Sequence, residues 1–374
     1  MVQKNVDYEK KLHDLLEIVY EREASDLHLK TNKTPMLRVA GDLLPLNDMP
    51  VMTSQDLKAL MELLVSKRLM SLFTKRGSVD FSYQWNKIRL RVNIFLQRGT
   101  LSFAMRFVNH KHLDYKSYNL PGDTLTKLAG SKSGLILVVG PSGCGKSTTL
   151  ATMIEDINQN QSRHIITIED PVEFVYEDKK SYIQQREIGQ DAEDFDVALT
   201  HVLRQDPNVI LVGEMRDQET VRMTMKAALT GHLVFSTLHT LNAKMTIERI
   251  SAYFKSEERE SVRQELGQAL KGVVSQRLIK QKGDNGRVPF LEILVGTNTV
   301  AKLLRENKLE ELNQVMQNRE AGMQTYDQSL VDLQNGGLIT KETALDYAED
   351  PSYVKRASEG RFSDGDRYSL LGNI

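Results

Sequence analysis

Residues 140–147 combine glycines, a lysine and a serine in the spacing of a phosphate-binding loop. The segment GPSGCGKS matches G-x4-G-K-[ST], with the apolar run GLILVVG before it and a helical pattern from Lys146 onward. In such loops backbone N–H groups converge on phosphate oxygens, the lysine bridges them and the serine hydroxyl ligates Mg²⁺. A glycine-rich turn formed by chance would not need these flanks. We predict nucleotide contacts from Gly140, Ser142, Gly143, Cys144, Gly145, Lys146, Ser147 and Thr148.

The loop also contains the chain's single cysteine, Cys144. One cysteine excludes an intramolecular disulfide or a multi-cysteine zinc site and suits a reducing cytosol. A helix N-terminus and Lys146 lie beside the thiol in sequence, and both favour the thiolate. We therefore expect raised reactivity at Cys144, although its sulfur has no function in phosphate transfer.

Two acidic clusters follow later apolar runs. Glu169-Asp170-Pro-Val-Glu173 ends the run HIITI, and Glu214 ends NVILVG ahead of Met-Arg-Asp217. Ligands of open α/β folds bind at the carboxyl ends of parallel strands, where these carboxylates are predicted to lie. We expect one acid of the first cluster to activate water, and Glu214 to hold Mg²⁺ directly or through a water. The alternative is that these acids cap helices or lie in solvated loops.

His232 and His239 stand at the two ends of a third apolar run, LVFSTL. Their rings could contact a γ-phosphate or the acidic clusters and so report the nucleotide state. A pair of histidines is more often structural. Residues seven apart on a strand face opposite sides, which disfavours a shared metal site.

The apolar patterns predict two domains. Helical spacing over 7–20 and 55–73, with alternating segments between and after them, predicts an α+β domain over 1–115. Residues 116–123 are the predicted linker, within a polar stretch that has a Pro-Gly turn. Nearly continuous apolar runs from Gly134 onward predict a doubly wound α/β domain over 124–350 with parallel strands. Residues 351–374 are polar and turn-rich, which predicts a frayed tail.

Composition restricts the classes of partner. The chain has 374 residues, 40% hydrophobic residues, 26% charged residues and a net charge of −1. These values are ordinary for a soluble protein and provide no overall attraction for nucleic acid or anionic lipid. No signal peptide pattern and no apolar run of about 20 residues is present, so we expect no direct membrane insertion.

The ordered motifs resemble the PilT/PilU family, the retraction ATPases of type IV pili within the secretion ATPase superfamily. The resemblance runs from about Lys10 to about Tyr347 and begins with ASDLHL and PMLRVAG at 24–29 and 35–41. It implies a PAS-like first domain, a RecA-like core and hydrolysis of ATP with Mg²⁺. It further implies that Glu173 is the general base, that Glu214 has the Mg²⁺ role of a Walker B residue, and that His232 and His239 form a histidine box.

The resemblance also implies a cytoplasmic homohexamer with ATP bound between neighbouring subunits. Arginines of the first domain would then stabilise the γ-phosphate, and these correspond to Arg91, Arg98 and Arg106. Their alternative is exposure on a sheet face. The implied partners are an inner-membrane pilus platform protein and a paralogous retraction ATPase. Through the platform protein, the ring would associate peripherally with the inner membrane.

One sequence motif differs from that of the PilT branch. That branch carries AIRNLIRE, whereas this chain reads TVAKLLRE over 299–306. The loss, together with GMQTYDQSL and GLIT after residue 321, favours the PilU branch. Extension ATPases carry a four-cysteine zinc site, which one cysteine cannot supply. Two other functions stay open: an ATP-binding subunit that braces another retraction ATPase, and a nucleic-acid translocase, which would need a basic channel.

Overall fold

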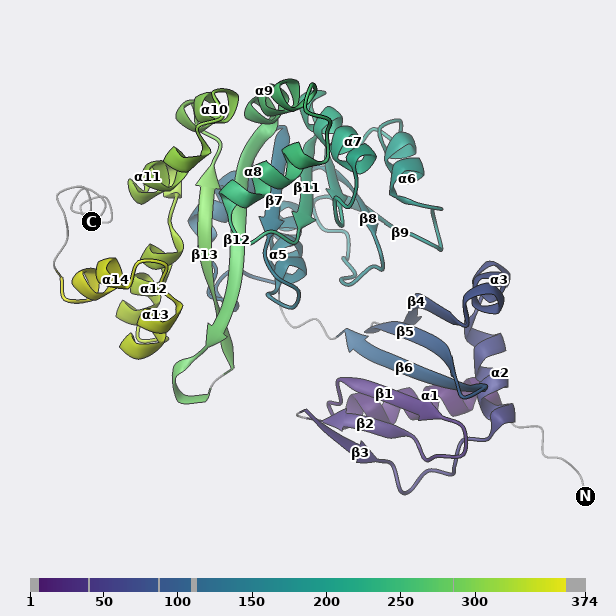
Figure 1. Cartoon of the computed structure of the whole chain (residues 1–374). Helices are drawn as coiled ribbons and strands as arrows, with labels where there is room; N and C mark the ends of the chain where they lie inside the picture. Colours follow the sequence, from purple (N-terminus) through teal and green to yellow (C-terminus); the bar gives the residue numbers. More distant parts are fainter. Residues whose placement is uncertain (1–6, 40, 87, 109–112, 285, 361–374) are drawn as a thin grey trace, which may run out of the picture. The chain divides into compact units, whose positions relative to one another are not determined.

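The protein is described from a computed structural model, which places residues 7–39, 41–86, 88–108, 113–284 and 286–360. The chain divides into two compact units (Figure 1). The first comprises Met1–Lys111 with two short later segments, Asp170–Val175 and Glu187–Asp191. The second comprises the remaining chain: His112–Glu169, Tyr176–Arg186 and Ala192–Ile374.

The first unit is built on a six-stranded sheet of order β3-β2-β1-β6-β5-β4, in which each strand pairs antiparallel with its neighbours. Alternating apolar residues form these strands and bury one face of the sheet. The strands are β1 (Asp26–Lys30), β2 (Met36–Val39), β3 (Asp42–Pro45), β4 (Ser78–Trp85), β5 (Ile88–Gln97) and β6 (Thr100–Val108).

Three helices supply the other half of this core. They are α1 (Tyr8–Glu21), α2 (Ser54–Leu64) and α3 (Lys67–Arg76). The predicted first helix is confirmed, and its apolar stripe is fully buried: Leu12, Leu15, Leu16 and Val19. The single helix predicted over 55–73 is wrong. Val65 is extended and the Ser66 hydroxyl accepts a hydrogen bond from the Leu69 N–H at 3.4 Å, so a new helix starts there.

The second unit contains a seven-stranded sheet of order β13-β12-β7-β11-β10-β8-β9. Strands β12, β7, β11, β10 and β8 run parallel, whereas β12 and β13 are antiparallel. The four predicted apolar runs form β7 (Gly134–Val139), β8 (His164–Glu169), β10 (Val209–Val212) and β11 (Leu233–Leu238). The others are β9 (Tyr182–Glu187), β12 (Leu270–Lys280) and β13 (Arg287–Val295). The predicted α/β class is therefore confirmed.

Helices connect and cover these strands (Figure 1). Their buried faces form a core with the central strands, which explains why those strands are apolar on both sides. The helices are α4 (Gly122–Ala129), α5 (Lys146–Asn160), α6 (Phe195–Val202), α7 (Gln218–Leu229), α8 (Ala243–Ala252), α9 (Arg259–Ala269), α10 (Asn298–Arg305), α11 (Leu312–Gln317), α12 (Tyr326–Asn335), α13 (Lys341–Tyr347) and α14 (Pro351–Ser358), with short 3-10 turns η1 (Lys282–Asp284), η2 (Leu309–Glu311) and η3 (Glu320–Gly322).

Two boundaries differ from the sequence interpretation. Residues 116–123, the predicted linker, belong to the second unit, where the nearby Tyr115 hydroxyl lies 3.1 Å from an Asp156 oxygen on α5. The tail predicted from residue 351 begins with helix α14, because Asp350 caps it and Val354 and Ala357 are buried against the C-terminal core. The rest of the tail, 361–374, lies outside the described residues.

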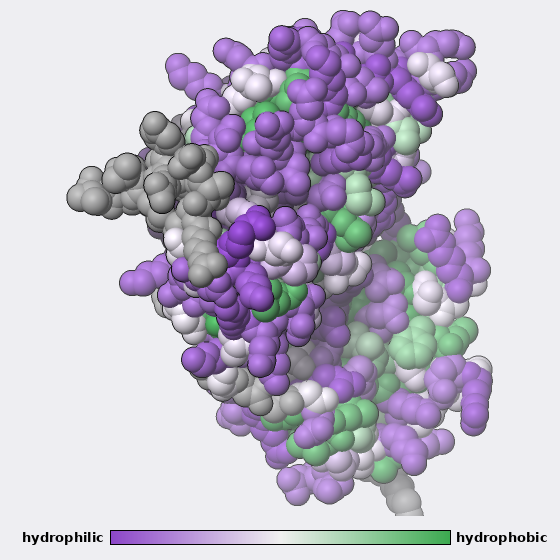
Figure 2. Space-filling model, turned by 60° about the vertical axis from the view of Figure 1, so that its left-hand side comes forward, coloured by the Kyte–Doolittle hydropathy of each residue, from purple (hydrophilic) through white to green (hydrophobic). Residues whose placement is uncertain are grey.

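Figure 2 shows a mainly polar surface interrupted by small apolar patches. Exposed large apolar residues include Leu43 and Leu44 on β3. Within the described ranges, no helix combines the length and apolar character that a bilayer span requires.

Candidate functional site

The phosphate loop connects β7 to α5, as predicted. Gly145 precedes the helix with φ +90°, and α5 begins at Lys146. The N–H groups of Lys146, Ser147 and Thr148 lie in the first turn, so no carbonyl of a preceding helical turn accepts a hydrogen bond from them. Gly140 has φ +147°, and a Cβ there would lie 2.2 Å from the Gln276 carbonyl oxygen. Glycine is therefore required at both ends of the loop.

Gln276 on β12 holds this loop from beneath and was missed by sequence reasoning. Its side chain is buried, its Nε2 donates to the Cys144 carbonyl oxygen at 2.6 Å, and its Oε1 accepts from the Thr149 hydroxyl at 2.6 Å. A trans peptide points its C=O and the next N–H in opposite directions. Holding the Cys144 carbonyl toward Gln276 therefore turns the Gly145 N–H away from Gln276. A glutamine inside the apolar run VVSQRLI was the available signal.

The expectation of a reactive thiol at Cys144 is wrong. Its side chain is buried, with 3% of the residue exposed. Burial raises the pKa of the thiol and outweighs the opposing effects of the Lys146 charge and the backbone N–H groups. The lysine and the helix N-terminus are present as predicted, but desolvation dominates.

Three predicted site residues meet at the carboxyl end of the sheet. The Lys146 ammonium lies 2.8 Å from the Gly140 carbonyl oxygen and 3.3 Å from Nδ1 of His239. Nε2 of the same ring lies 3.3 Å from a Glu214 oxygen, and Arg216 Nε lies 2.8 Å from the other oxygen. A lysine ammonium only donates, so Nδ1 accepts and Nε2 carries the proton that it donates to Glu214. One imidazole thus links the phosphate loop to the second acidic cluster.

His232 does not join this group. It precedes β11, whereas His239 follows it, and the register pairs Leu233 with Gly134 at the far end of β7. Six strand residues place the two histidines about 20 Å apart, at opposite edges of the sheet. The His232 ring is 3.1 Å from the Ala227 carbonyl oxygen, at the C-terminal end of α7, which is a structural contact. The two histidines therefore do not act together within one subunit.

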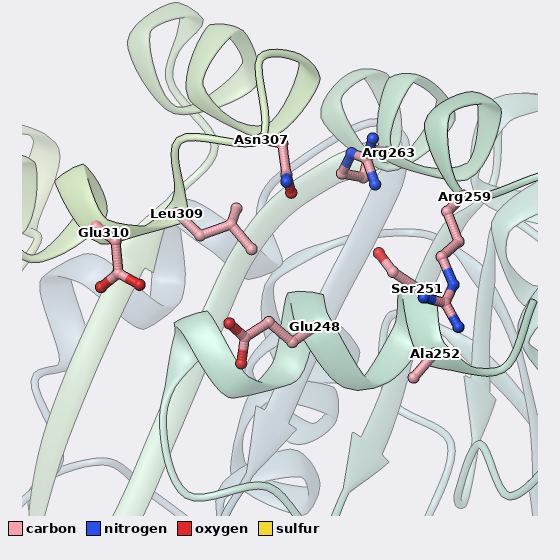
Figure 3. Close-up of a pocket in the computed structure, with 8 residues that line it drawn as sticks. All are labelled: Glu248, Ser251, Ala252, Arg259, Arg263, Asn307, Leu309 and Glu310. Atoms are coloured by element: carbon pink, nitrogen blue, oxygen red, sulfur yellow. The ribbon is translucent and has the colours of Figure 1, made fainter. Parts of the chain in front are cut away.

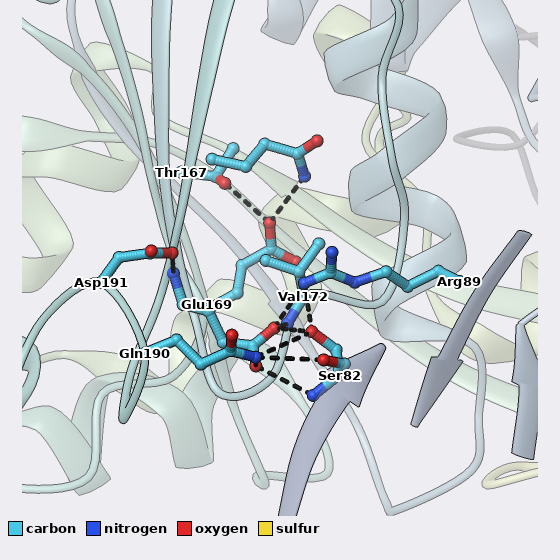
Figure 4. A network of polar contacts seen from close by, with 9 residues as sticks. Ser82, Arg89, Thr167, Glu169, Val172, Gln190 and Asp191 are labelled. Carbon is cyan, nitrogen blue, oxygen red and sulfur yellow. Dashed lines mark hydrogen bonds and ion pairs between the residues drawn. The ribbon is translucent and has the colours of Figure 1, made fainter. Parts of the chain in front are cut away.

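The first acidic cluster is divided between the two units. Glu169 ends β8 in the second unit, where it accepts hydrogen bonds from Thr167 at 2.7 Å and Gln185 at 3.2 Å (Figure 4). Glu173 lies in the segment Asp170–Val175, which belongs to the first unit. The two carboxylates therefore have different surroundings, which the sequence does not distinguish.

A buried carboxylate, Glu187, fixes the Glu173 segment within the first unit. It accepts hydrogen bonds from the Val172 and Ser82 N–H groups, each at 3.1 Å, and pairs with Arg89 at 2.7 Å. Burial opposes ionisation, but these hydrogen bonds outweigh it and lower the pKa of Glu187. The network therefore anchors the residue adjacent to Glu173, and no sequence motif indicated it.

The three candidate arginines are only partly brought together. Arg91 and Arg106 are paired directly across β5 and β6, and both are exposed. Arg106 Nε lies 2.8 Å from a carboxylate oxygen of Asp26 on β1. Burial opposes ionisation of Asp26, but hydrogen bonds from Ser25 and Arg106 lower its pKa. Arg98 lies in the β5–β6 turn with φ +50°, seven residues along from Arg91, so it is separate from the pair.

The fold and this site define a P-loop ATPase. A glycine-rich loop at a helix N-terminus, its lysine and an acidic strand end at the same sheet edge form an arrangement typical of proteins that hydrolyse nucleoside triphosphates. The chain belongs to the family described as Type II/IV secretion system protein, which matches residues 3–320.

Curated relatives and solved structures agree with this assignment. The chain is 44% identical to a twitching motility protein of Neisseria gonorrhoeae over 84% of both chains. It is 35% identical to the type IV pilus ATPase PilU of Pseudomonas aeruginosa, over 96% of this chain and 94% of that protein. A crystal structure of the pilus retraction motor PilT with bound ADP matches with TM-score 0.84 and 43% identity, over 92% of this chain and 99% of that chain.

These matches confirm the predicted resemblance to pilus retraction ATPases. A retraction ATPase is therefore the class to which fold, site and relatives point. The preference for the PilU branch stays a prediction, because relatives with both names match along most of the chain.

Proposed function

We propose that this chain hydrolyses ATP with Mg²⁺ to power or assist the retraction of type IV pili. The observation that carries the proposal is the contact series from Lys146 through His239 to Glu214, with 3.3 Å at each step. It joins the group that binds phosphate to the acid at the neighbouring strand end. Support from outside the chain comes from relatives that bear the names PilT and PilU.

The residues divide the chemistry among them. The loop N–H groups and Lys146 bind the phosphates, and Glu173 removes a proton from the attacking water. His239 reports the nucleotide state, because a γ-phosphate competes with its Nδ1 for the Lys146 ammonium. The resulting change reaches Glu214 through the Nε2 proton.

The site residues fit Mg²⁺. The Ser147 hydroxyl lies in the first turn of α5 and the Glu214 carboxylate lies at the same sheet edge, and both are oxygen donors of the kind that Mg²⁺ prefers. When bound, the ion neutralises charge that develops on the phosphates. Within the described residues, no cluster of three or more His, Cys, Asp or Glu side chains forms a metal site. A Mg²⁺ held by one hydroxyl, one carboxylate, nucleotide and water does not require such a cluster.

The working form we propose is a cytoplasmic homohexamer that acts at the inner membrane through a pilus platform protein, with a paralogous retraction ATPase as a second partner. The paired Arg91 and Arg106 are presented on an exposed strand face, which suits an action on nucleotide held by a neighbouring subunit. Arg98 lies in a turn apart from the arginine pair, and His232 lies at the opposite sheet edge from His239, so we assign these two residues lesser roles.

The test combines hydrolysis in solution with retraction in cells. Glu173→Gln should keep nucleotide binding and lower turnover by about 10²–10⁴-fold, whereas Lys146→Ala should weaken binding itself. Glu193→Gln, an exposed glutamate of the same unit as Lys146, is the matched control. A strain lacking only this protein should retract pili more slowly or with less force. Normal retraction in that strain, or near-normal turnover of Glu173→Gln, would contradict the proposal.

A further inference from the structure

A cavity of about 350 Å³ lies between α8, α9 and the loop that follows α10 (Figure 3). None of the residues that line it belongs to the phosphate loop. Ser251 projects into it from α8, Arg259 and Arg263 from α9, and Asn307 from the loop. Its volume is at the lower end of the range of about 300–1,000 Å³ for small-molecule sites.

Two residues that line this cavity each have a buried polar atom without a partner. Ser251 is 8% exposed, and its hydroxyl oxygen has no hydrogen-bond partner. The Nε of Arg263 is also buried and without a partner. Buried polar groups are nearly always paired, and leaving one unpaired costs about 1–3 kcal/mol. Both atoms belong to residues that line the cavity, so a molecule bound there is one source of the missing partners.

The charges of the cavity favour an anion on the α9 side. Glu248 and Glu310 line the opposite side, and Lys244 pairs with both of them. In the placed part of the chain, neither Arg259 nor Arg263 has a carboxylate oxygen within 4.0 Å. Arg259 is held in position because its Nε donates to the Phe254 carbonyl oxygen at 3.2 Å.

We propose that this cavity binds a small hydroxylated oxyanion, a molecule with a phosphate or carboxylate group and one or more hydroxyls. The two guanidinium groups and the Ser251 hydroxyl donate to the oxyanion, and such charge-assisted hydrogen bonds are about twice as strong as neutral ones. The amide of Asn307 and the carboxylate of Glu248 bind the hydroxyls.

The ligand would act on the nucleotide site through α8. A second cavity, of about 590 Å³, is lined by Glu214 and His239 and shares Glu248 and Ala252 of α8 with the first. Helix α8 starts at Ala243, four residues after His239, and Asn242 caps it. A ligand that fixes α8 therefore restrains the turn that carries His239, and so changes the rate of hydrolysis. The binding itself does not depend on the proposed function.

Binding is measured by calorimetry with 3-phosphoglycerate as the probe, on the full chain saturated with ADP and Mg²⁺ so that the phosphate loop is filled. Glycerol 3-phosphate and citrate in parallel distinguish a phosphate ligand from a carboxylate ligand. Arg263→Gln should weaken binding about 10–100-fold, and Ser251→Ala about 5–10-fold. Lys255→Gln removes an exposed charge between the same two helices and should change the affinity less than about twofold.

The proposal is overturned if none of the three probes binds at a concentration of about 10 mM. That concentration is on the order of the largest Kd that such a site would show. It is equally overturned if Arg263→Gln and Ser251→Ala bind as tightly as the unaltered protein, because the probe then binds elsewhere. Binding that is lost in both variants and kept in Lys255→Gln supports it, whatever the rate of ATP hydrolysis.

Discussion

Replacing Gln276 by leucine tests whether a buried side chain sets the orientation of the phosphate loop. The change keeps the approximate volume and removes both hydrogen bonds of 2.6 Å, to the Cys144 carbonyl and from the Thr149 hydroxyl. A buried carbonyl without a partner costs about 1–3 kcal/mol, which the peptide relieves by turning. Turning withdraws the Gly145 N–H from the phosphate.

The magnitude follows from the bond that is lost. A hydrogen bond to a charged group contributes about 1.5–3 kcal/mol, so nucleotide affinity should fall about 10–150-fold. The N–H binds ground state and transition state alike, so KM for ATP should rise while kcat changes little. Thr149→Val removes one hydrogen bond and keeps the Cys144 carbonyl in place, so it should weaken ADP binding less than about threefold.

The assay is calorimetric titration with ADP, followed by ATP hydrolysis over a range of ATP concentrations. Gln268→Leu, the same substitution at an exposed site on α9, is the matched control. Circular dichroism shows whether each variant is folded. A folded Gln276→Leu protein that binds ADP within about twofold of the unaltered chain would refute the reasoning, because the loop would then hold its shape unaided.

Three further results are expected. Mixing Arg106→Ala with Glu173→Gln should restore part of the ATPase activity if the arginine acts on a neighbour's nucleotide, and no recovery in rings shown to be mixed excludes that role. Glu292 lies beneath α8, and burial raises its pKa to about 7 against hydrogen bonds from α8 and β12. The folded form thus binds the proton more tightly than the unfolded form, so the free energy of unfolding should fall by about 3 kcal/mol between pH 4.5 and 7. Glu292→Gln should remove this pH dependence. A pH dependence that is unchanged in Glu292→Gln would show that Glu292 does not cause it. Alkylation of Cys144 by a maleimide at pH 7 should be slow in the folded protein and fast in denaturant, and equal rates would contradict the raised pKa.

Local spacing was enough to predict much of the second unit. The strands that end at Val139, Glu169, Val212 and Leu238 are apolar on both faces, and the glycines of the phosphate loop fix a conformation that few sequences allow. Because these signals lie within a few residues of one another, the sequence alone determined the ATPase core and the positions of Lys146 and Glu214.

Contacts between residues that are distant in the sequence could not be predicted from local spacing. The Gln276 contacts span 127 and 132 residues, and the pairing of Arg89 with Glu187 spans 98. No local pattern reveals such partners, because strand order decides which residues meet. The thiol of Cys144 shows the same limit: its neighbours in sequence favour the thiolate, but burial by the fold raises its pKa.

The sequence shows where the two histidines stand along the chain, but only the tertiary structure shows which of them lies at the site. His232 and His239 are equivalent in the sequence, one at each end of an apolar run. The direction of β11 within a parallel sheet decides that only His239 lies beside Lys146 and Glu214. A strand carries its two ends to opposite edges of a sheet, and only the strand pairing in three dimensions fixes which edge holds the phosphate loop.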